Sequence, residues 1–168
     1  MDKNQYEQFI EAQDLIERKE YQLAINQLEQ LAKNKNKRAI FELANVYKLI
    51  NKEFYKEKII NLLVLSGELG YDNSYFELGL IFYYDHKYEL AYRYFEKTSN
   101  PYKYLYLGVI ELNKKIKNYS LENAVKYFIK GSKKNIKKCN YYLSICYHHG
   151  YGVSKNQEKE ILYYSKAK

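Results

Sequence analysis

The residues best suited to chemistry lie in one stretch, from Cys139 to Gly152, which holds both cysteines and two of the three histidines of the chain. The two cysteines are seven residues apart, which is about 10 Å along a helix and too far for a disulfide. Cys146 and His149 are close enough to share a metal, but a zinc site needs further ligands that this sequence does not offer. We therefore expect no metal and no cofactor.

Other catalytic interpretations of this stretch also lack partners. His148 and His149 are adjacent, so on a helix they point in different directions instead of forming an i, i+4 metal pair. The turn around Gly150 and Gly152 follows no strand and lacks the Gly-Lys-Ser/Thr ending of a phosphate loop. Cys146 would need a paired base to act as a nucleophile. We expect no catalytic residues, and the chain is not predicted to be an enzyme.

The elements that position these residues are helices. Apolar residues recur at three- and four-residue spacings along the chain, which is typical of amphipathic helices, and turn residues divide them into pairs. The pattern predicts an all-α fold, an α-solenoid of about five antiparallel helix hairpins in one domain. The expected repeats are residues 4–36, 37–70, 71–100, 101–136 and 137–168.

One position in the first helix of every hairpin holds a small residue, which we call the small position. Its members are Ala12, Ala44, Gly79, Gly108 and Ser144, at spacings of 32, 35, 29 and 36 residues. A small side chain lets the paired helix approach closely, and a period near 35 residues is typical of solenoid repeats. We expect a leucine at Gly79 or Gly108 to overpack its hairpin.

The last hairpin carries the most specific motif. Leu143-Ser144, a tyrosine three residues on, and the Gly150-x-Gly152-Val153 turn resemble the Sel1-like repeat. Residues 65–70 leading into 75–79 resemble the junction between two such repeats, and the first and third hairpins resemble tetratricopeptide repeats. The resemblance implies a right-handed superhelix whose concave face, lined by the first helix of each hairpin, holds a peptide or protein.

On that model the partner-binding residues follow from their offset to the small position. We expect the groove to be faced by the residues four and five positions after the small position, one position after it, and six positions before it. They are Arg38, Asn45, Lys48, Tyr83, Tyr84, Tyr102, Leu112, Asn113, Lys138, His148 and His149. Tyrosine suits such a surface because it offers a large ring and a hydroxyl at low entropic cost.

Charge is distributed unevenly along the chain. Residues 1–70 are balanced, whereas residues 71–168 carry the whole net charge of +8. A predicted basic patch contributes much of it: Lys114, Lys115, Lys117, Lys130, Lys133, Lys134 and Lys137. Such a field attracts an acidic partner. Nucleic acid is the less favoured ligand, because the patch has no arginine to read bases and no recognised binding motif.

These observations predict a non-catalytic protein–protein interaction scaffold. The alternatives are an immunity-type or inhibitor protein that neutralises a toxin or enzyme by direct binding, and a nucleic-acid-associated protein with a basic surface. The first residues contain no apolar signal region, and the longest apolar run is too short to span a membrane, so a cytoplasmic location is expected. Ile161, Leu162 and Tyr164 cannot all be covered by one neighbouring helix, so we expect an apolar edge there.

Overall fold

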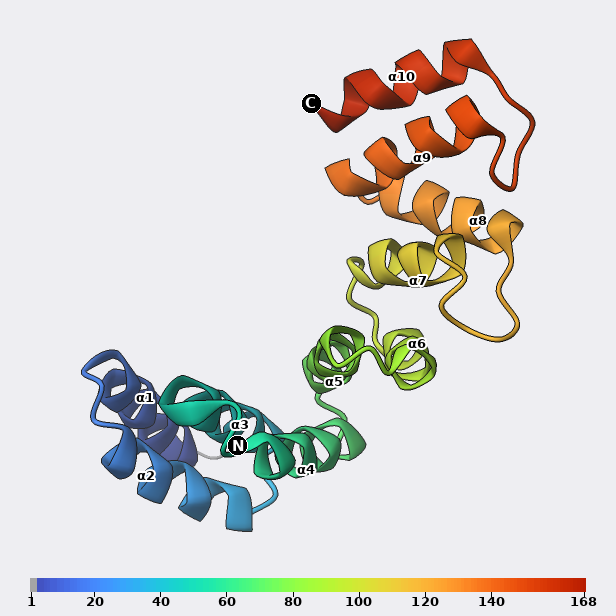
Figure 1. The fold of residues 1–168 in the computed structure, drawn as a ribbon. Coiled ribbons are helices and arrows are strands. Elements are labelled where there is room, and N and C mark those ends of the chain that lie inside the picture. Colours follow the sequence, from blue (N-terminus) through green and yellow to red (C-terminus); the bar gives the residue numbers. More distant parts are fainter. Residues whose placement is uncertain (1–2) are drawn as a thin grey trace. The chain divides into compact units, whose positions relative to one another are not determined.

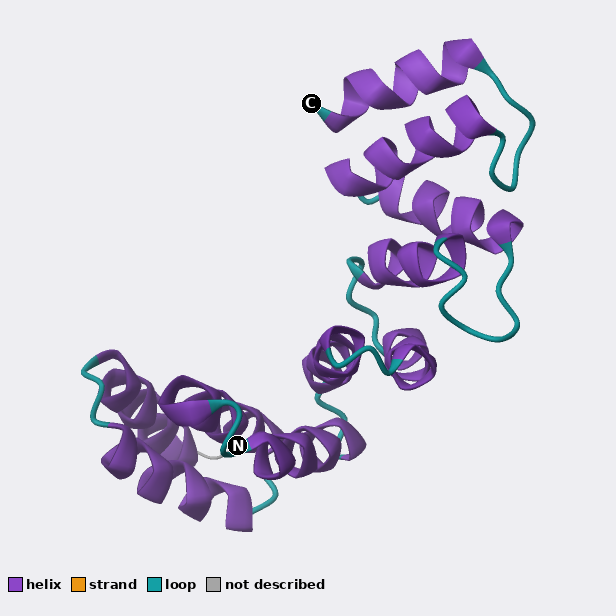
Figure 2. Ribbon diagram, in the orientation of Figure 1, coloured by secondary structure: helices purple, strands orange, loops and turns teal. Residues whose placement is uncertain are grey.

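A computed structural model describes residues 3–168 of the chain. Within this range the chain forms ten helices and no strand (Figures 1 and 2), which confirms the all-α prediction. The helices are α1 (Lys3–Glu17), α2 (Tyr21–Lys33), α3 (Lys37–Asn51), α4 (Lys56–Glu68), α5 (Asp72–Tyr84), α6 (Tyr88–Lys97), α7 (Lys103–Leu112), α8 (Leu121–Ser132), α9 (Lys137–His149) and α10 (Gln157–Ala167).

The chain divides into two compact units, residues 1–78 and 79–168. In the first unit α1 packs on α2, α2 on α3, and α3 on α4. In the second unit α6 packs on α7, α7 on α8, α8 on α9, and α9 on α10, and α7 also contacts α9. Contacts between consecutive helices are typical of solenoids, in which each repeat touches its neighbours. The single domain of five repeats with the stated boundaries stays a prediction.

The small positions are buried, and the two that are glycines accommodate a ring from the paired helix. A Cβ atom added at Gly79 would lie 2.5 Å from the Phe95 ring, and one at Gly108 would lie 2.5 Å from the Phe128 ring. Both phenylalanines are completely buried. The absence of a side chain on the first helix therefore creates the space that an aromatic ring of the second helix fills.

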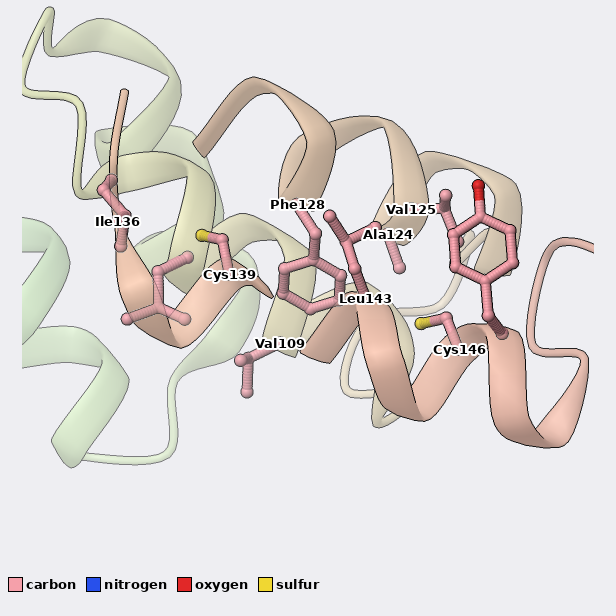
Figure 3. Packing of buried hydrophobic residues seen from close by; sticks show 10 residues of the cluster. Val109, Ala124, Val125, Phe128, Ile136, Cys139, Leu143 and Cys146 are labelled. Atoms are coloured by element: carbon pink, nitrogen blue, oxygen red, sulfur yellow. The ribbon is translucent and has the colours of Figure 1, made fainter. Parts of the chain in front are cut away.

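The core of the second unit continues this packing between α7, α8 and α9 (Figure 3). Phe128 lies at its centre and stacks on Tyr142 of the next helix, with ring centroids 5.0 Å apart. The cluster consists of Leu105, Val109, Ala124, Val125, Phe128, Ile136, Cys139, Leu143, Cys146 and Tyr147. Both cysteines are thus free, buried packing residues.

Burial controls the chemistry of these two thiols, raising the pKa of Cys139 to about 12 and that of Cys146 to about 11 from an ordinary value of 9.0. Both thiols stay protonated at pH 8, so we expect a thiol-reactive dye to label the folded protein far more slowly than the protein in guanidinium chloride. Above pH 9 the thiols of the unfolded protein ionise before those of the folded protein. The contribution of the buried, protonated thiols to the free energy of unfolding is therefore lost between pH 9 and 12. Rapid labelling of the folded protein at pH 8 would contradict this assignment.

Most turns between helices contain one residue in the left-handed conformation, which lets a helix end sharply. Glycine fills this position at Gly70 and Gly150, with φ of 86° and 79°. At the other turns of this kind a non-glycine residue fills it: Lys19, Lys35, His86, Lys114 and Asn135. Gly67 lies buried near the end of α4, against the ring of Tyr75.

Candidate binding site on the second unit

A cluster of tyrosines marks the start of the second unit. The ring of Tyr83 lies 5.5 Å from Tyr84, 5.6 Å from Tyr88 and 5.2 Å from Tyr106, measured between centroids. Tyr83 is half-buried, and burial raises the pKa of its hydroxyl. Tyr84 is 63% exposed. Tyr83 therefore contributes to packing, whereas most of the Tyr84 side chain faces solvent.

A cavity of about 400 Å³ opens beside α7 and α9, and we call it the α7–α9 pocket. Its lining is Leu112, Asn113, Lys114, Leu121, Tyr142, Ile145 and Tyr151. Two of these residues, Leu112 and Asn113, belong to the predicted groove set. The lining combines apolar and aromatic surface with a few polar groups, which is the usual character of a binding pocket.

The loop of residues 113–120 borders this pocket and is held by a buried carboxylate. Glu111 is 1% exposed. It accepts hydrogen bonds from the Tyr92 hydroxyl at 3.0 Å and from the backbone N–H of Ser120 at 2.6 Å. The hydroxyl of Tyr127 lies 2.8 Å from that of Tyr92. The network fixes the far end of the loop, where Ser120 caps α8 by accepting from the Asn123 N–H.

The glycine turn after α9 shapes another wall of the pocket. Gly152 has a φ of 66°, and a Cβ atom there would overlap the backbone of Leu121. Only glycine fits such a close approach. The turn places Tyr151 in the pocket lining, and the ring of His149 stacks on Tyr151 with centroids 5.1 Å apart. Both glycines adopt the left-handed conformation of a turn, as the sequence suggested, and Gly152 also makes a close packing contact.

A second cavity, of about 250 Å³, lies between α9 and α10, and we call it the end pocket. It is lined by Tyr141, Ser144, Ile145, His148, His149, Glu160 and Tyr164. The Nδ1 atom of His148 lies 3.0 Å from a carboxylate oxygen of Glu160. The structure thus brings both predicted histidines to the end pocket and not to the lining of the α7–α9 pocket.

The remaining predicted groove residues are spread over both units. In the first unit Arg38 stacks over the Phe9 ring at 4.7 Å, Asn45 donates to Glu42 and Lys48 pairs with Glu77 at 2.6 Å. In the second unit Tyr102 and Lys138 are exposed near the first residues of α7 and α9. Their role in binding stays a prediction.

The predicted basic patch separates into two groups of exposed lysines. Lys114, Lys115 and Lys117 lie in the loop before α8, beside the α7–α9 pocket. The other group is Lys130, Lys133, Lys134 and Lys137, at the end of α8 and the start of α9. Lys130 is the tenth residue of α8, about 14 Å along the helix from its first residue, so the groups lie toward opposite ends of α8. Of the seven lysines, only Lys114 lines the α7–α9 pocket.

Several pocket residues were not singled out as binding residues from the sequence. They are Leu121, Tyr142, Ile145 and Tyr151. The sequence around Tyr151 does indicate an exposed ring, because a large aromatic residue between two turn glycines has little room to be buried. The surroundings of Ile145 and Leu121 depend on how α8 and α9 pack, which no local pattern specifies.

Among the described residues, no cluster of three or more histidine, cysteine, aspartate or glutamate side chains could hold a metal ion. Between residues 3 and 168, no helix combines the length and apolar character needed to cross a bilayer.

The sequence matches no protein-family model and no curated protein, but solved structures share its fold. A protective antigen present in uropathogenic Escherichia coli strains, described as displaying an SLR fold, is 21% identical over 85% of this chain and 32% of its own, with a TM-score of 0.72. A Sel1 repeat protein from Oxalobacter formigenes is 17% identical over 88% of this chain and 63% of its own, with a TM-score of 0.71. MamA from Desulfovibrio magneticus RS-1, from residue 41 on, is 12% identical over 99% of this chain and 94% of its own, with a TM-score of 0.66.

These likenesses define the class as an α-solenoid built from helix hairpins. More specifically, the fold is that of Sel1-like repeat proteins, which confirms the prediction made from the last hairpin. The chain spans about a third of the first of these structures and less than two thirds of the second.

Proposed function

We propose that the second unit binds a short acidic segment of another protein in the α7–α9 pocket and over the neighbouring Tyr84 ring. The observation that carries this proposal is the composition of the pocket and its border. Leu112, Tyr142 and Ile145 provide an apolar lining that can take an anchor side chain, and the loop with Lys114, Lys115 and Lys117 provides positive charge beside it. Repeat folds of this class typically mediate protein–protein interactions.

The buried carboxylate near this surface does not cancel the positive charge of the loop. Glu111 directs its oxygens to Tyr92 and the Ser120 N–H and is shielded from solvent. The lysines beside the pocket are exposed, so an approaching carboxylate meets them first. Charges at the rim of an interface mainly raise the association rate, and salt weakens their effect.

The chemistry of the pocket favours a protein ligand over nucleic acid. Proteins that bind single-stranded nucleic acid have a continuous positive groove along the backbone of the bound strand. These lysines instead form two groups toward opposite ends of α8. An inhibitor or immunity-type role is a special case of the proposal, in which the bound segment belongs to a toxin or an enzyme.

The proposal is tested with short peptides selected from a displayed random library on the intact protein. We expect the selected peptides to carry an apolar or aromatic anchor flanked by Asp or Glu. Replacing Lys115 and Lys117 with glutamate should weaken the affinity for such a peptide by about tenfold at low salt. The matched control replaces Lys133 and Lys134 with glutamate and should leave the affinity nearly unchanged. Fluorescence anisotropy of the labelled peptide measures both.

A second arm tests the pocket itself. Tyr151→Ala removes an exposed ring from its lining, so it should weaken peptide binding without lowering the melting temperature. Equal effects of the two lysine pairs, or unchanged binding in Tyr151→Ala, would refute the proposed site. Preferential binding of single-stranded RNA with a steep salt dependence would favour the nucleic-acid alternative instead.

A further inference from the structure

A group of lysines that the peptide proposal does not use gathers where α7 begins, α8 ends and α9 begins. We call it the basic end, and its members are Lys103, Lys130, Lys133, Lys134, Lys137 and Lys138. Lys103 is partly buried and the others are exposed. Lys133 and Lys134 lie in the turn that joins the hairpin of α7 and α8 to that of α9 and α10.

The packing of three helix ends brings these lysines together (Figure 1). A side chain at Gly131, near the end of α8, would overlap Cys139 of α9 and would touch Tyr104 of α7. The Nζ atoms of Lys103 and Lys130 both lie over the Tyr104 ring, 5.6 and 5.9 Å from its centroid. Charges from two helices are thus held beside one ring, at the same end of the second unit.

Few carboxylates lie near the basic end. No aspartate or glutamate occurs in the stretches 97–110 and 123–157. Burial, followed by the charges of Glu96 and Glu111, raises the pKa of Tyr127, so these two carboxylates lie near the ring that Lys130 covers. Two carboxylates against six lysines leave a net positive field.

Half of the lysines have no partner within the protein. Lys103 donates a hydrogen bond to the Thr98 carbonyl, and Lys137 donates one to the backbone oxygen of Lys168 at 2.6 Å. Three side chains make no hydrogen bond or ion pair with any other described residue: Lys133, Lys134 and Lys138. Their ammonium groups are available to an anionic ligand.

We propose that the basic end docks the second unit on an anionic bilayer surface. Clusters of about four to eight lysines attract anionic lipids, and each lysine near the surface raises the affinity by about fivefold. Tyr102, which is 54% exposed, lies directly before Lys103. A tyrosine at this position suits the headgroup region, because its ring is apolar and its hydroxyl is polar.

The chemistry of the basic end favours a lipid surface over nucleic acid or an acidic protein. All six cations are lysines, which act as point charges, whereas arginine provides the paired hydrogen bonds used to recognise phosphates and bases. Single-stranded nucleic acid stacks its bases on a series of rings, but the Tyr104 ring already stacks on Tyr127 and lies beside two lysines. Lysine is also depleted in the cores of protein–protein interfaces.

Binding of the intact protein to lipid vesicles tests the proposal. We expect co-sedimentation with phosphatidylcholine vesicles that contain phosphatidylserine, weakened by salt, and none with phosphatidylcholine alone. Lys133→Gln combined with Lys134→Gln should lower the affinity by about 25-fold at low salt, about fivefold for each charge removed. The matched control, Lys115→Gln combined with Lys117→Gln, removes the same charge near the other end of α8 and should leave vesicle binding nearly unchanged.

A third variant tests the ring. Tyr102→Ala should weaken vesicle binding without changing its salt dependence, because the ring carries no charge. All replaced side chains are exposed, so circular dichroism should show the variants folded. The proposal would be overturned by a lack of binding to phosphatidylserine vesicles at low salt, by equal losses in the two lysine pairs, or by a single-stranded oligonucleotide that displaces the protein from the vesicles at equal phosphate concentration. The two lysine pairs exchange roles in the peptide experiment, so the two proposals fail independently.

Discussion

Replacing Gly108 with leucine is expected to lower the free energy of unfolding by about 3 kcal/mol, the upper range for an overpacked core. A Cβ atom at this position would already lie 2.5 Å from the Phe128 ring, and that ring cannot retreat because it is completely buried and stacked on Tyr142. Leucine forms helices more readily than glycine by about 1 kcal/mol. Without the overlap, leucine would therefore stabilise the protein. A decrease in the free energy of unfolding thus indicates that the added side chain clashes with the ring. Chemical denaturation followed by circular dichroism measures it.

A double-mutant cycle separates the clash from other effects. Gly108→Ala and Phe128→Leu should each destabilise the protein, the first by overlap and the second by loss of ring packing. Together they should cost less than the sum of the single changes, because the smaller side chain makes room for the new methyl group. Strictly additive effects would show that the glycine is not needed for the approach of that ring.

Replacing Glu111 with alanine is expected to cost about 2 to 3 kcal/mol, the range for losing hydrogen bonds to a buried charged group. The Tyr92 hydroxyl and the Ser120 N–H would lose their acceptor, and the loop of residues 113–120 would lose its attachment to α7. We expect faster hydrogen exchange at the Ser120 amide in addition to the global loss. Peptide binding should also weaken, because this loop borders the α7–α9 pocket.

Glu122 supplies the matched control for this prediction. It also contacts Ser120, accepting from its hydroxyl at 2.8 Å, but it is exposed. The hydrogen bond from its backbone N–H, followed by the one from Ser120, lowers the pKa of this carboxyl. Because water replaces its contacts, Glu122→Ala should change the free energy of unfolding far less than Glu111→Ala does. A comparable loss in both variants would show that burial of Glu111 is not what makes it important.

The fold was predictable because its signals are local and repeated. Apolar spacing indicated the helices, and the series from Ala12 to Ser144 indicated where paired helices approach. The turns were less visible, because Lys35, His86 and Asn135 adopt a left-handed conformation that usually signals glycine. Asparagine and histidine adopt that geometry more often than other non-glycine residues, but lysine gives no such signal.

The candidate site was predictable only in part. Leu112 and Asn113 were identified from their offset to the small position, and they line the α7–α9 pocket. The same offset selected His148 and His149, which instead line the end pocket, because α10 folds back along α9. The buried Glu111 could not be foreseen, since its partners Tyr92 and Ser120 are distant in sequence and meet only after the helices pack.

The left-handed turns also change how the net charge of the chain should be understood. Lys19, Lys35 and Lys114 occupy such turns directly after α1, α2 and α7. The carbonyl ends of helices carry partial negative charge, so a cation placed there is favourable by several tenths of a kcal/mol. Part of the +8 thus has a structural use at helix ends, in addition to any role in attracting an incoming molecule.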